Sequence, residues 1–269
     1  RRLVTAGSSY GRGGFAGVAE LKAIERADVA TFHKKHFVPG NALLMVVGRY
    51  NALEMRKQIL EKFGVWNGPA PERAWKNFSD TRLVKRMGKA GKLKAGELPL
   101  VLLVHRPGLT QANLRMGFQG PLIKDPDHYA LVVANALFGE YFGSRLNTTV
   151  RDKLALTYSI GSSFSYSREL GVFSISAATR NESAGQLVRQ TWELLREFAR
   201  KGATEEEVHA AKEYLVGSFP LGTATIGAVA ARWLAGTVYD LGPDYLNEFL
   251  PKVMAVTREQ VNAAVAKYL

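Results

Sequence analysis

An arginine and a tyrosine seven residues apart are the side chains in this sequence best suited to chemistry. Arg151 and Tyr158 lie in the run Val150-Arg-Asp-Lys-Leu-Ala-Leu-Thr-Tyr-Ser159, where we expect a helix to give way to a strand. A guanidinium and a phenol both donate hydrogen bonds, and an oxyanion developing on a carbonyl accepts them more strongly than the carbonyl itself. The pair is therefore suited to stabilising a transition state at a peptide carbonyl.

Ordinary packing offers a second interpretation of the same two residues. Arg151 is expected near the C-terminal end of its helix, where the helix dipole favours a cation. Tyr158 would begin a strand and share one face with Ile160, Phe164 and Tyr166, a pattern typical of core or cross-strand packing. The residues by themselves leave both interpretations open.

Other kinds of site find less support in the residue types. There is no cysteine, which excludes disulfides, thiolate metal sites and a cysteine nucleophile. His33 and His36 are three apart on a predicted helix, but a zinc site needs a third ligand and no Glu accompanies them. Neither His-x-x-Glu-His nor His-Glu-x-x-His occurs. We interpret the pair as a partly solvated helix face and predict no metal site in this chain.

The charge of the chain is concentrated in its first third. Residues 1–97 contain 19 Lys/Arg against 8 Asp/Glu, and the whole chain of 269 residues has a net charge of +12. Six of these basic residues lie between Arg82 and Lys94, where there is no acid. A solvated linker is the preferred interpretation and an acidic partner the next, whereas nucleic acid is disfavoured because no aromatics interleave with the charges. No apolar stretch approaches the ~20 residues of a membrane span.

Hydrophobic periodicity and capping residues predict helices alternating with short strands. Helices are predicted over 26–37, after the Asn51 cap, from 125 or 127 to 138, and over 145–153, 183–200, 204–218, 222–240, 243–255 and 258–269. Strands are predicted over 42–48, 100–105, 112–118, 157–165 and 170–179. The pattern indicates an α+β fold with an antiparallel sheet backed by helices.

A weak internal repeat suggests how these elements are grouped. Residues 256–269 resemble residues 24–37 at a constant offset of 232, and Arg26, Val29 and Lys35 recur as Arg258, Val261 and Lys267. We therefore expect tandem homologous units, the first truncated at its start and the second at its end. The predicted division is a first unit over 1–80, a basic linker over 81–97 and a second unit over 98–269.

The run Gly139-Glu-Tyr-Phe-Gly-Ser-Arg-Leu146, followed by the 150–159 run, resembles the second-half signature of the pitrilysin/insulinase-type zinc peptidases, the inverzincins. Gln111, the run Pro39–Gly48 and the helix start at Thr204 agree with that family. The resemblance implies tandem α+β units in which one unit carries His-x-x-Glu-His and another supplies an Arg-Tyr pair. It assigns that catalytic pair to Arg151 and Tyr158.

The absence of a zinc motif shapes the function that this resemblance implies. The chain would be inactive alone and would lend Arg151 and Tyr158 to a zinc-bearing homologous subunit or unit, with an extended peptide as substrate. A hetero-oligomer is expected, with zinc in the partner or missing unit, and the family favours the periplasm. Two alternatives remain: a non-enzymatic core or processing-peptidase-like subunit, and a fragment of a single-chain peptidase whose zinc motif lies upstream.

Overall fold

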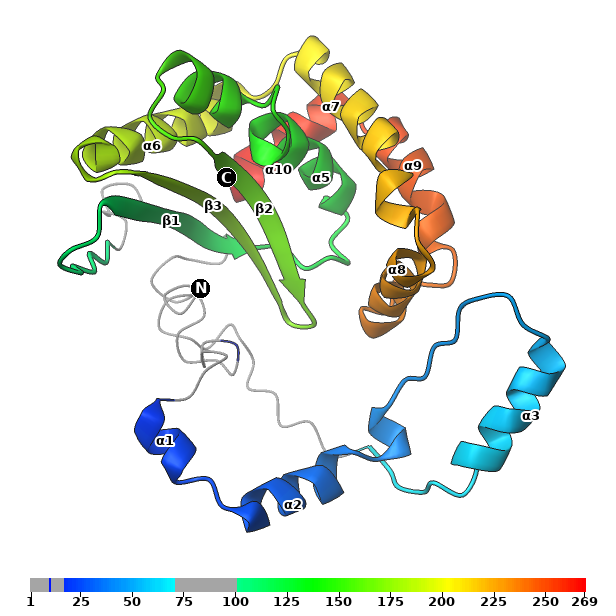
Figure 1. Cartoon of the computed structure of the whole chain (residues 1–269). Coiled ribbons are helices and arrows are strands. Elements are labelled where there is room, and N and C mark those ends of the chain that lie inside the picture. Colours follow the sequence, from blue (N-terminus) through cyan, green and yellow to red (C-terminus); the bar gives the residue numbers. More distant parts are fainter. Residues whose placement is uncertain (1–9, 11–16, 71–100) are drawn as a thin grey trace.

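The computed structural model describes Tyr10, residues 17–70 and residues 101–269. Figure 1 shows a helical N-terminal part and a larger C-terminal part with a sheet. The N-terminal part contains α1 (Val18–Lys22), α2 (Arg26–His36), the short 3-10 helix η2 (Pro39–Asn41) and α3 (Ala52–Phe63). As expected, Asn51 caps α3, its side chain accepting hydrogen bonds from the Leu53 and Glu54 N–H groups.

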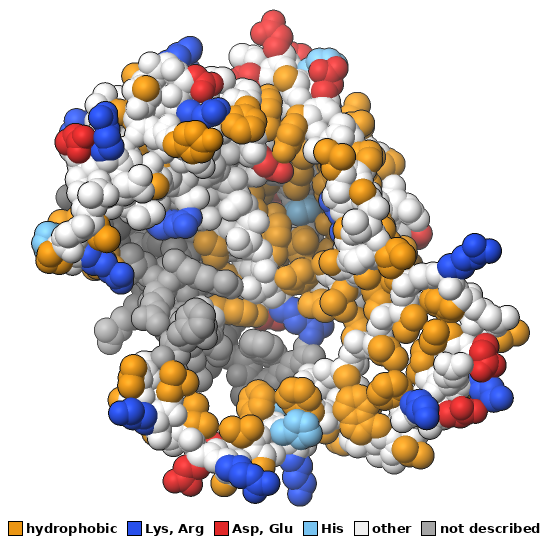
Figure 2. All heavy atoms as spheres, viewed as in Figure 1, with side chains coloured by type: hydrophobic (Ala, Val, Ile, Leu, Met, Phe, Trp, Pro, Cys, Tyr) orange, Lys and Arg blue, Asp and Glu red, His pale blue; other side chains and the backbone are white. Residues whose placement is uncertain are grey.

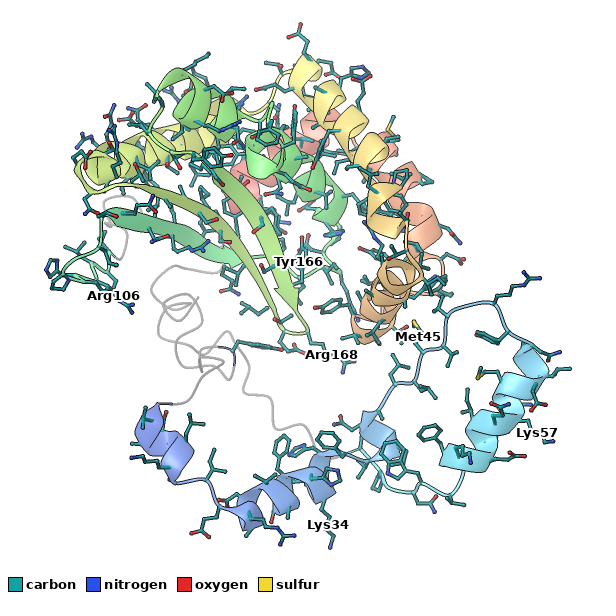
Figure 3. The ribbon with its side chains drawn as sticks, in the orientation of Figure 1. Lys34, Met45, Lys57, Arg106, Tyr166 and Arg168 are labelled. Atoms are coloured by element: carbon teal, nitrogen blue, oxygen red, sulfur yellow. The ribbon has the colours of Figure 1, made fainter. Side chains whose placement is uncertain are left out.

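The C-terminal part is built on a three-stranded antiparallel sheet. Its strands are β1 (Gln111–Gly120), β2 (Ile160–Ser167) and β3 (Leu170–Arg180), in the order β1-β3-β2. In the register, Gln111 lies opposite Arg180 and Ile160 lies opposite Ala177. The β2–β3 hairpin carries Arg168 at its tip (Figure 3). The predicted α+β class with an antiparallel sheet is confirmed.

The two faces of this sheet differ because successive strand residues point to opposite sides. The apolar residues Leu114, Met116 and Phe118 of β1 face the helices and pack on the core. Near the hairpin, the other side carries Leu170 and Val172 of β3, which are buried with Tyr10 packed against them. The rest of this side, called here the open face, is polar and formed of small or hydrophilic residues. Its members are Gln111, Asn113, Arg115 and Gly117 of β1, Gly161 and Ser163 of β2, and Ser174, Ser176 and Ala178 of β3.

Two layers of helices cover the apolar side of the sheet (Figure 1). The chain forms α5 (His128–Asn135), the π-helices η4 (Ala136–Glu140) and η5 (Asn147–Lys153), η6 (Asn181–Ser183), α6 (Ala184–Lys201), α7 (Glu205–Ser218), η7 (Leu221–Thr223), α8 (Ile226–Val238), α9 (Tyr245–Ala255) and α10 (Arg258–Tyr268). Helices α5 and α6 contact the sheet, α10 packs on both, and α7 and α9 pack on α5. In the described residues no single helix is long and apolar enough to cross a membrane, although the bent pair Glu205–Thr223 and Ile226–Val238 together would meet that length and composition.

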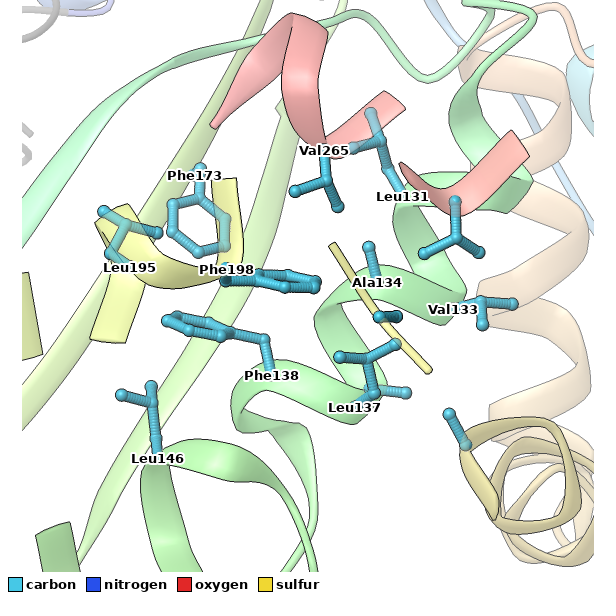
Figure 4. Close-up of a cluster of buried hydrophobic side chains, with 14 of the residues drawn as sticks. Leu131, Val133, Ala134, Leu137, Phe138, Leu146, Phe173, Leu195, Phe198 and Val265 are labelled. Carbon is cyan, nitrogen blue, oxygen red and sulfur yellow. The ribbon is translucent and has the colours of Figure 1, made fainter. Parts of the chain in front are cut away.

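The hydrophobic core lies between the sheet and these helices (Figure 4). Phe138 stacks on Phe198 with ring centroids 5.1 Å apart and contacts Phe173 of β3 at 6.4 Å. All three are almost fully buried, as are Leu131 and Val265. Burying each such side chain contributes about 1.5–3 kcal/mol, so this cluster holds the layers together.

Two predicted strands are wrong. Residues 42–47 are extended but pair with no strand in the described chain, and Met45 lies in this segment (Figure 3). Residues 101–105 likewise form no strand, and Leu103 is 90% exposed. An apolar run indicates hydrophobicity, but a strand also needs a hydrogen-bonded partner, and neither run has one here. The basic run 82–94 and the predicted linker 81–97 lie outside the described residues.

Candidate functional site

The helix that carries Arg151 is held at its first residue by an ion pair with another helix. The structure confirms a helix over residues 145–153, most of it wound as the π-helix η5. Arg145 Nε and Nη2 donate to Glu207 Oε1 and Oε2 at 2.5 and 2.6 Å, and Nη2 also donates to the Gly202 carbonyl at 2.8 Å. Burial alone would raise the pKa of Glu207, but hydrogen bonds from Arg145 and Thr204 outweigh it and hold that pKa below its usual value.

A left-handed turn ends this helix and redirects the chain toward Tyr158. Ala155 has φ of 48°, a conformation that normally favours glycine. The Leu156 N–H bonds the Val150 carbonyl at 3.0 Å, and the Leu154 N–H bonds the Thr149 carbonyl at 3.0 Å. The loop closed by Leu156 spans residues 150–156, one residue more than the Schellman arrangement, and like that arrangement it satisfies a carbonyl in the last turn of the helix.

Two threonines then fasten the chain to the sheet on either side of this turn. The buried Thr157 hydroxyl donates to the Ala178 carbonyl at 2.6 Å and accepts from the Ser159 N–H at 3.1 Å. Thr179 of β3 donates to the Leu156 carbonyl. Because its two neighbours are bound in this way, the backbone at Tyr158 has little freedom.

Tyr158 itself projects into solvent. Its side chain is 90% exposed, and strand β2 begins only at Ile160. The packing interpretation, in which Tyr158 joined Ile160 and Phe164 on one strand face, is therefore wrong. The extra residues between the helix and β2 place Tyr158 outside the alternation of the strand, so its phenol is free to meet a ligand.

Arg151 lies beside Tyr158 and close to two aromatic rings. Its guanidinium carbon is 4.7 Å from the centre of the Phe142 ring and 5.9 Å from that of Tyr158. Nη1 is 3.6 Å from Asp152 Oδ1, and the Arg151 side chain is 30% exposed. Stacking on aromatic faces orients a guanidinium while leaving its N–H groups available to a third partner.

Both residues line one groove at the end of the open face. The groove has a volume of ≈ 780 Å³, and Gln111, Asn113 and Arg115 of β1 line its other side. The structure thus brings together the predicted pair, Arg151 and Tyr158, and adds polar side chains from a strand some forty residues earlier. This is a site of two hydrogen-bond donors at the edge of a polar groove.

The Gly139–Leu146 segment has mainly a packing role. A Cβ on Gly139 would come within 2.7 Å of the Ser162 backbone nitrogen, so only glycine allows η4 to approach β2 this closely. Burial raises the pKa of Glu140, while a hydrogen bond from Asn135 (2.8 Å) opposes that rise. Ser162 completes this network by donating to Asn135 at 2.9 Å.

The histidines do not form a metal centre in the described part of the chain. There, no three His, Asp or Glu side chains are arranged to hold a metal ion, so these residues do not fit zinc. The His33 ring of α2 stacks on Phe37 with ring centres 4.7 Å apart, and the His36 ring packs at a tilt against Phe32 at 4.5 Å. His209 is exposed and faces Glu213, whereas His128 is buried in the core.

Four groups of this site escaped prediction from the sequence: Phe142, Asn113, Arg115 and Thr157. A signal existed for the strand residues, because polar side chains at Gln111, Asn113 and Arg115 alternate with apolar ones. No comparable signal marks Phe142 or Thr157, because their contacts with Arg151 and with the Ala178 carbonyl follow from the fold.

Comparisons with known proteins agree with this architecture. A family model described as the peptidase M16 inactive domain matches residues 23–215. An uncharacterised zinc protease of Streptomyces coelicolor is 24% identical over 265 residues, covering 97% of this chain and 55% of the relative. The chain thus spans about half the length of that relative.

Solved structures show the same fold. The crystal structure of a peptidase M16 inactive domain from Pseudomonas fluorescens is similar with a TM-score of 0.77 at 24% identity, over 97% of this chain and 58% of that one. The crystal structure of a Helicobacter pylori protease gives a TM-score of 0.79 at 19% identity, over 94% of this chain and 58% of that one. With a family match over most of its length, the chain belongs to the peptidase M16 inactive-domain family, the group of zinc peptidases that its sequence resembles.

Proposed function

We propose that this chain is the zinc-free part of an M16 zinc endopeptidase and supplies Arg151 and Tyr158 to the substrate peptide. The observation that carries the proposal is the position of Tyr158, exposed on a fastened loop, beside Arg151 and at a polar groove. The metal and the base that activates water belong to another, homologous unit.

The two side chains would act on the carbonyl of the bond to be cleaved. The Tyr158 hydroxyl and the Arg151 guanidinium donate hydrogen bonds to its oxygen, and these strengthen as negative charge develops there. The Thr157 and Thr179 hydrogen bonds and the ring contacts of Arg151 hold both donors in place before substrate arrives. Such preorganised donors are typically worth ~2.7–4 kcal/mol each in the transition state.

The N-terminal part offers a surface for the homologous unit. None of the residues of α1, α2 and α3 is buried, and Val29 and Phe32 of α2 are each 58% exposed. Figure 2 shows apolar side chains gathered over this part of the molecule. Large exposed apolar areas are uncommon on monomers and typically mark interfaces.

The internal repeat supports the same partner. Val261 of α10, which corresponds to Val29 of α2, is fully buried where α10 packs on α5. A helix with the role of α5, supplied by the homologous unit, would bury Val29 in the same way. The division into units over 1–80 and 98–269 with a linker over 81–97 is part of this proposal. Because the chain spans 55% of its Streptomyces relative, the zinc-bearing unit is either a separate subunit or another part of a longer chain.

A non-enzymatic subunit that only assembles or binds peptides is the competing function. Such a protein has no need for an exposed phenol on a fastened loop beside an oriented guanidinium. The arrangement around Tyr158 therefore favours a contribution to catalysis.

The decisive experiment is cleavage of a fluorogenic peptide by the assembled zinc-bearing and zinc-free units. Tyr158→Phe removes one hydroxyl and is expected to lower kcat about 10²–10³-fold with a small change in KM. Tyr214→Phe removes the same atom from a residue that stacks on Tyr141 outside the groove, and serves as the matched control. An unchanged kcat for Tyr158→Phe, with the assembly intact, would exclude the proposed role and favour the non-enzymatic subunit.

A further inference from the structure

The sheet that floors the groove carries only positive charge. Strands β1, β2 and β3 contain two charged residues, Arg115 and Arg180, and no Asp or Glu. Both arginines line the groove together with Arg151, and among the described residues that line it Asp152 is the one acidic side chain. The groove therefore has an excess of cationic side chains over acidic ones.

Two of these three arginines already have carboxylate neighbours. Arg151 Nη1 lies 3.6 Å from Asp152, and Arg180 Nε lies 3.4 Å from Glu182. Arg115 has neither an ion pair nor a hydrogen bond with any residue that the structure describes. Within the described part of the chain, the groove arginine without a carboxylate neighbour is therefore Arg115.

The surroundings of Arg115 leave room for a ligand. Arg115 of β1 lies opposite Ser176 of β3, and Ser176 in turn lies opposite Gly161 of β2. The next residue of β1 on the same face is Gly117. Because these neighbours are small, the Arg115 side chain extends further from the sheet than the side chains around it. An extended peptide can lie on this floor without displacing large side chains.

The register places Arg115 close to the Tyr158 end of the groove. Thr157 bonds the Ala178 carbonyl, and Ala178 lies opposite Asn113, two residues before Arg115. Arg115 is thus two residues along β1 from Asn113, which is about 7 Å, and β1 is two strands away from β2, which is about 10 Å across the sheet. Since an extended peptide advances about 3.3 Å per residue, side chains within about three residues of the polarised carbonyl come within reach of Arg115.

We propose that this groove selects extended peptides with an Asp or Glu side chain within about three residues of the carbonyl held by Arg151 and Tyr158. Arg115 is the residue that determines this preference, since a guanidinium can bind a carboxylate with two parallel hydrogen bonds. The inference rests on the proposed peptide-binding function and adds the substrate class to it.

The test measures binding of two labelled peptides to the full chain by fluorescence anisotropy. The peptides are rich in Ser, Ala and Val, have equal length, and differ only by Glu or Gln at one central position. The Glu peptide is expected to bind about fivefold more tightly, with a difference that shrinks as salt is raised. Arg115→Gln should reduce the preference to less than about twofold, and Arg115→Lys should restore part of it. Arg189→Gln, a change of an exposed arginine on α6 outside the groove, should leave the preference intact.

Each result separates this inference from the function on which it rests. Equal binding of the two peptides by the unchanged chain would overturn the acidic preference and leave the proposed function standing. A preference that survives Arg115→Gln would overturn the assignment to Arg115. Binding of neither peptide would overturn the inference together with the peptide-binding part of the proposed function.

Discussion

The position of Tyr158 depends on one local turn and on two hydrogen bonds that join its neighbouring residues to β3. The left-handed turn at Ala155 changes the direction of the chain, and the hydroxyls of Thr157 and Thr179 attach the chain to β3. Because the phenol makes few contacts of its own, its position is set almost entirely by this backbone.

A pair of substitutions at Ala155 tests the importance of the turn. Ala155 is exposed, so a larger side chain meets no core residue and acts through the backbone. A β-branched residue is strongly disfavoured at φ of 48°, and Ala155→Val is expected to lower the free energy of unfolding by about 1–2 kcal/mol. Ala155→Gly, which tolerates the turn, should be neutral or slightly stabilising.

Urea denaturation of the three proteins measures this difference. In the assembled peptidase, Ala155→Val should also lower the cleavage rate, because Tyr158 moves with the turn. Equal stabilities for the Val and Gly variants would show that the turn is not strained.

At the scale of elements, the helix over residues 145–153 is the part that presents Arg151. The Arg145–Glu207 pair fixes its first residue to the start of α7, and Arg145 also lies 4.8 Å above the Phe198 ring in the core. The helix is thereby tied to both layers of the domain, which makes it a rigid support for the guanidinium of Arg151.

Loss of this pair should cost stability. Arg145→Gln leaves a partly buried Glu207 carboxylate without its main partner, and the free energy of unfolding is expected to fall by about 2 kcal/mol at neutral pH. The hydrogen bonds from Arg145 lower the folded-state pKa of Glu207, so the stabilisation is present above its unfolded pKa and disappears as pH falls through the folded value. The double variant with Glu207→Gln should recover part of the loss, because no unpaired charge remains.

The matched control is Lys201→Gln, which breaks an exposed pair with Glu197 on α6. Such surface pairs contribute little, so its denaturation midpoint should stay close to that of the unchanged protein. If Arg145→Gln were as mild as this control, the anchoring role of the pair would be refuted.

For the molecule as a whole, stability should depend on pH through the buried His128. This residue is 4% exposed and its Nδ1 lies 3.1 Å from the Tyr166 hydroxyl, whereas its Nε2 has no hydrogen-bond partner among the residues that the structure describes. Burial lowers the pKa of His128 to about 4, an effect that nearby Asp125 opposes. The unfolded chain binds a proton below about pH 6.5, whereas the folded protein does so only near pH 4. Stability from this residue is therefore full above about pH 6.5 and is lost as pH falls toward 4, a loss of about 3 kcal/mol.

Comparison of His128→Gln with the unchanged chain isolates this contribution. The unfolding free energy of the unchanged chain minus that of His128→Gln should decrease steadily as pH is lowered from about 7 to about 4.5. His209→Gln, at an exposed position facing Glu213, is the control and should keep the full pH dependence of the parent. A constant difference between His128→Gln and the parent would mean that His128 does not titrate in this range.

Much of the C-terminal fold follows from local signals in the sequence. Apolar periodicity located the main helices, α7 begins after Thr204 as predicted, and α10, predicted over 258–269, begins after the cap Thr257. The alternation along 112–118 and 170–179 located β1 and β3. The strands predicted over 42–48 and 100–105 failed because pairing is a long-range property that an apolar run does not encode.

The sequence by itself determined which side chains are available at the candidate site: Arg151 and Tyr158 seven residues apart, no cysteine, and no zinc motif. Only the tertiary structure decided that Tyr158 faces solvent, that Arg151 lies over Phe142, and that Arg115 borders the same groove. The physical reason is the distance along the chain over which each kind of interaction acts. Spacing and propensity act over a few neighbouring residues, whereas these relations depend on the register of β1 against β3 and on the hydrogen bond from Thr157 to the Ala178 carbonyl.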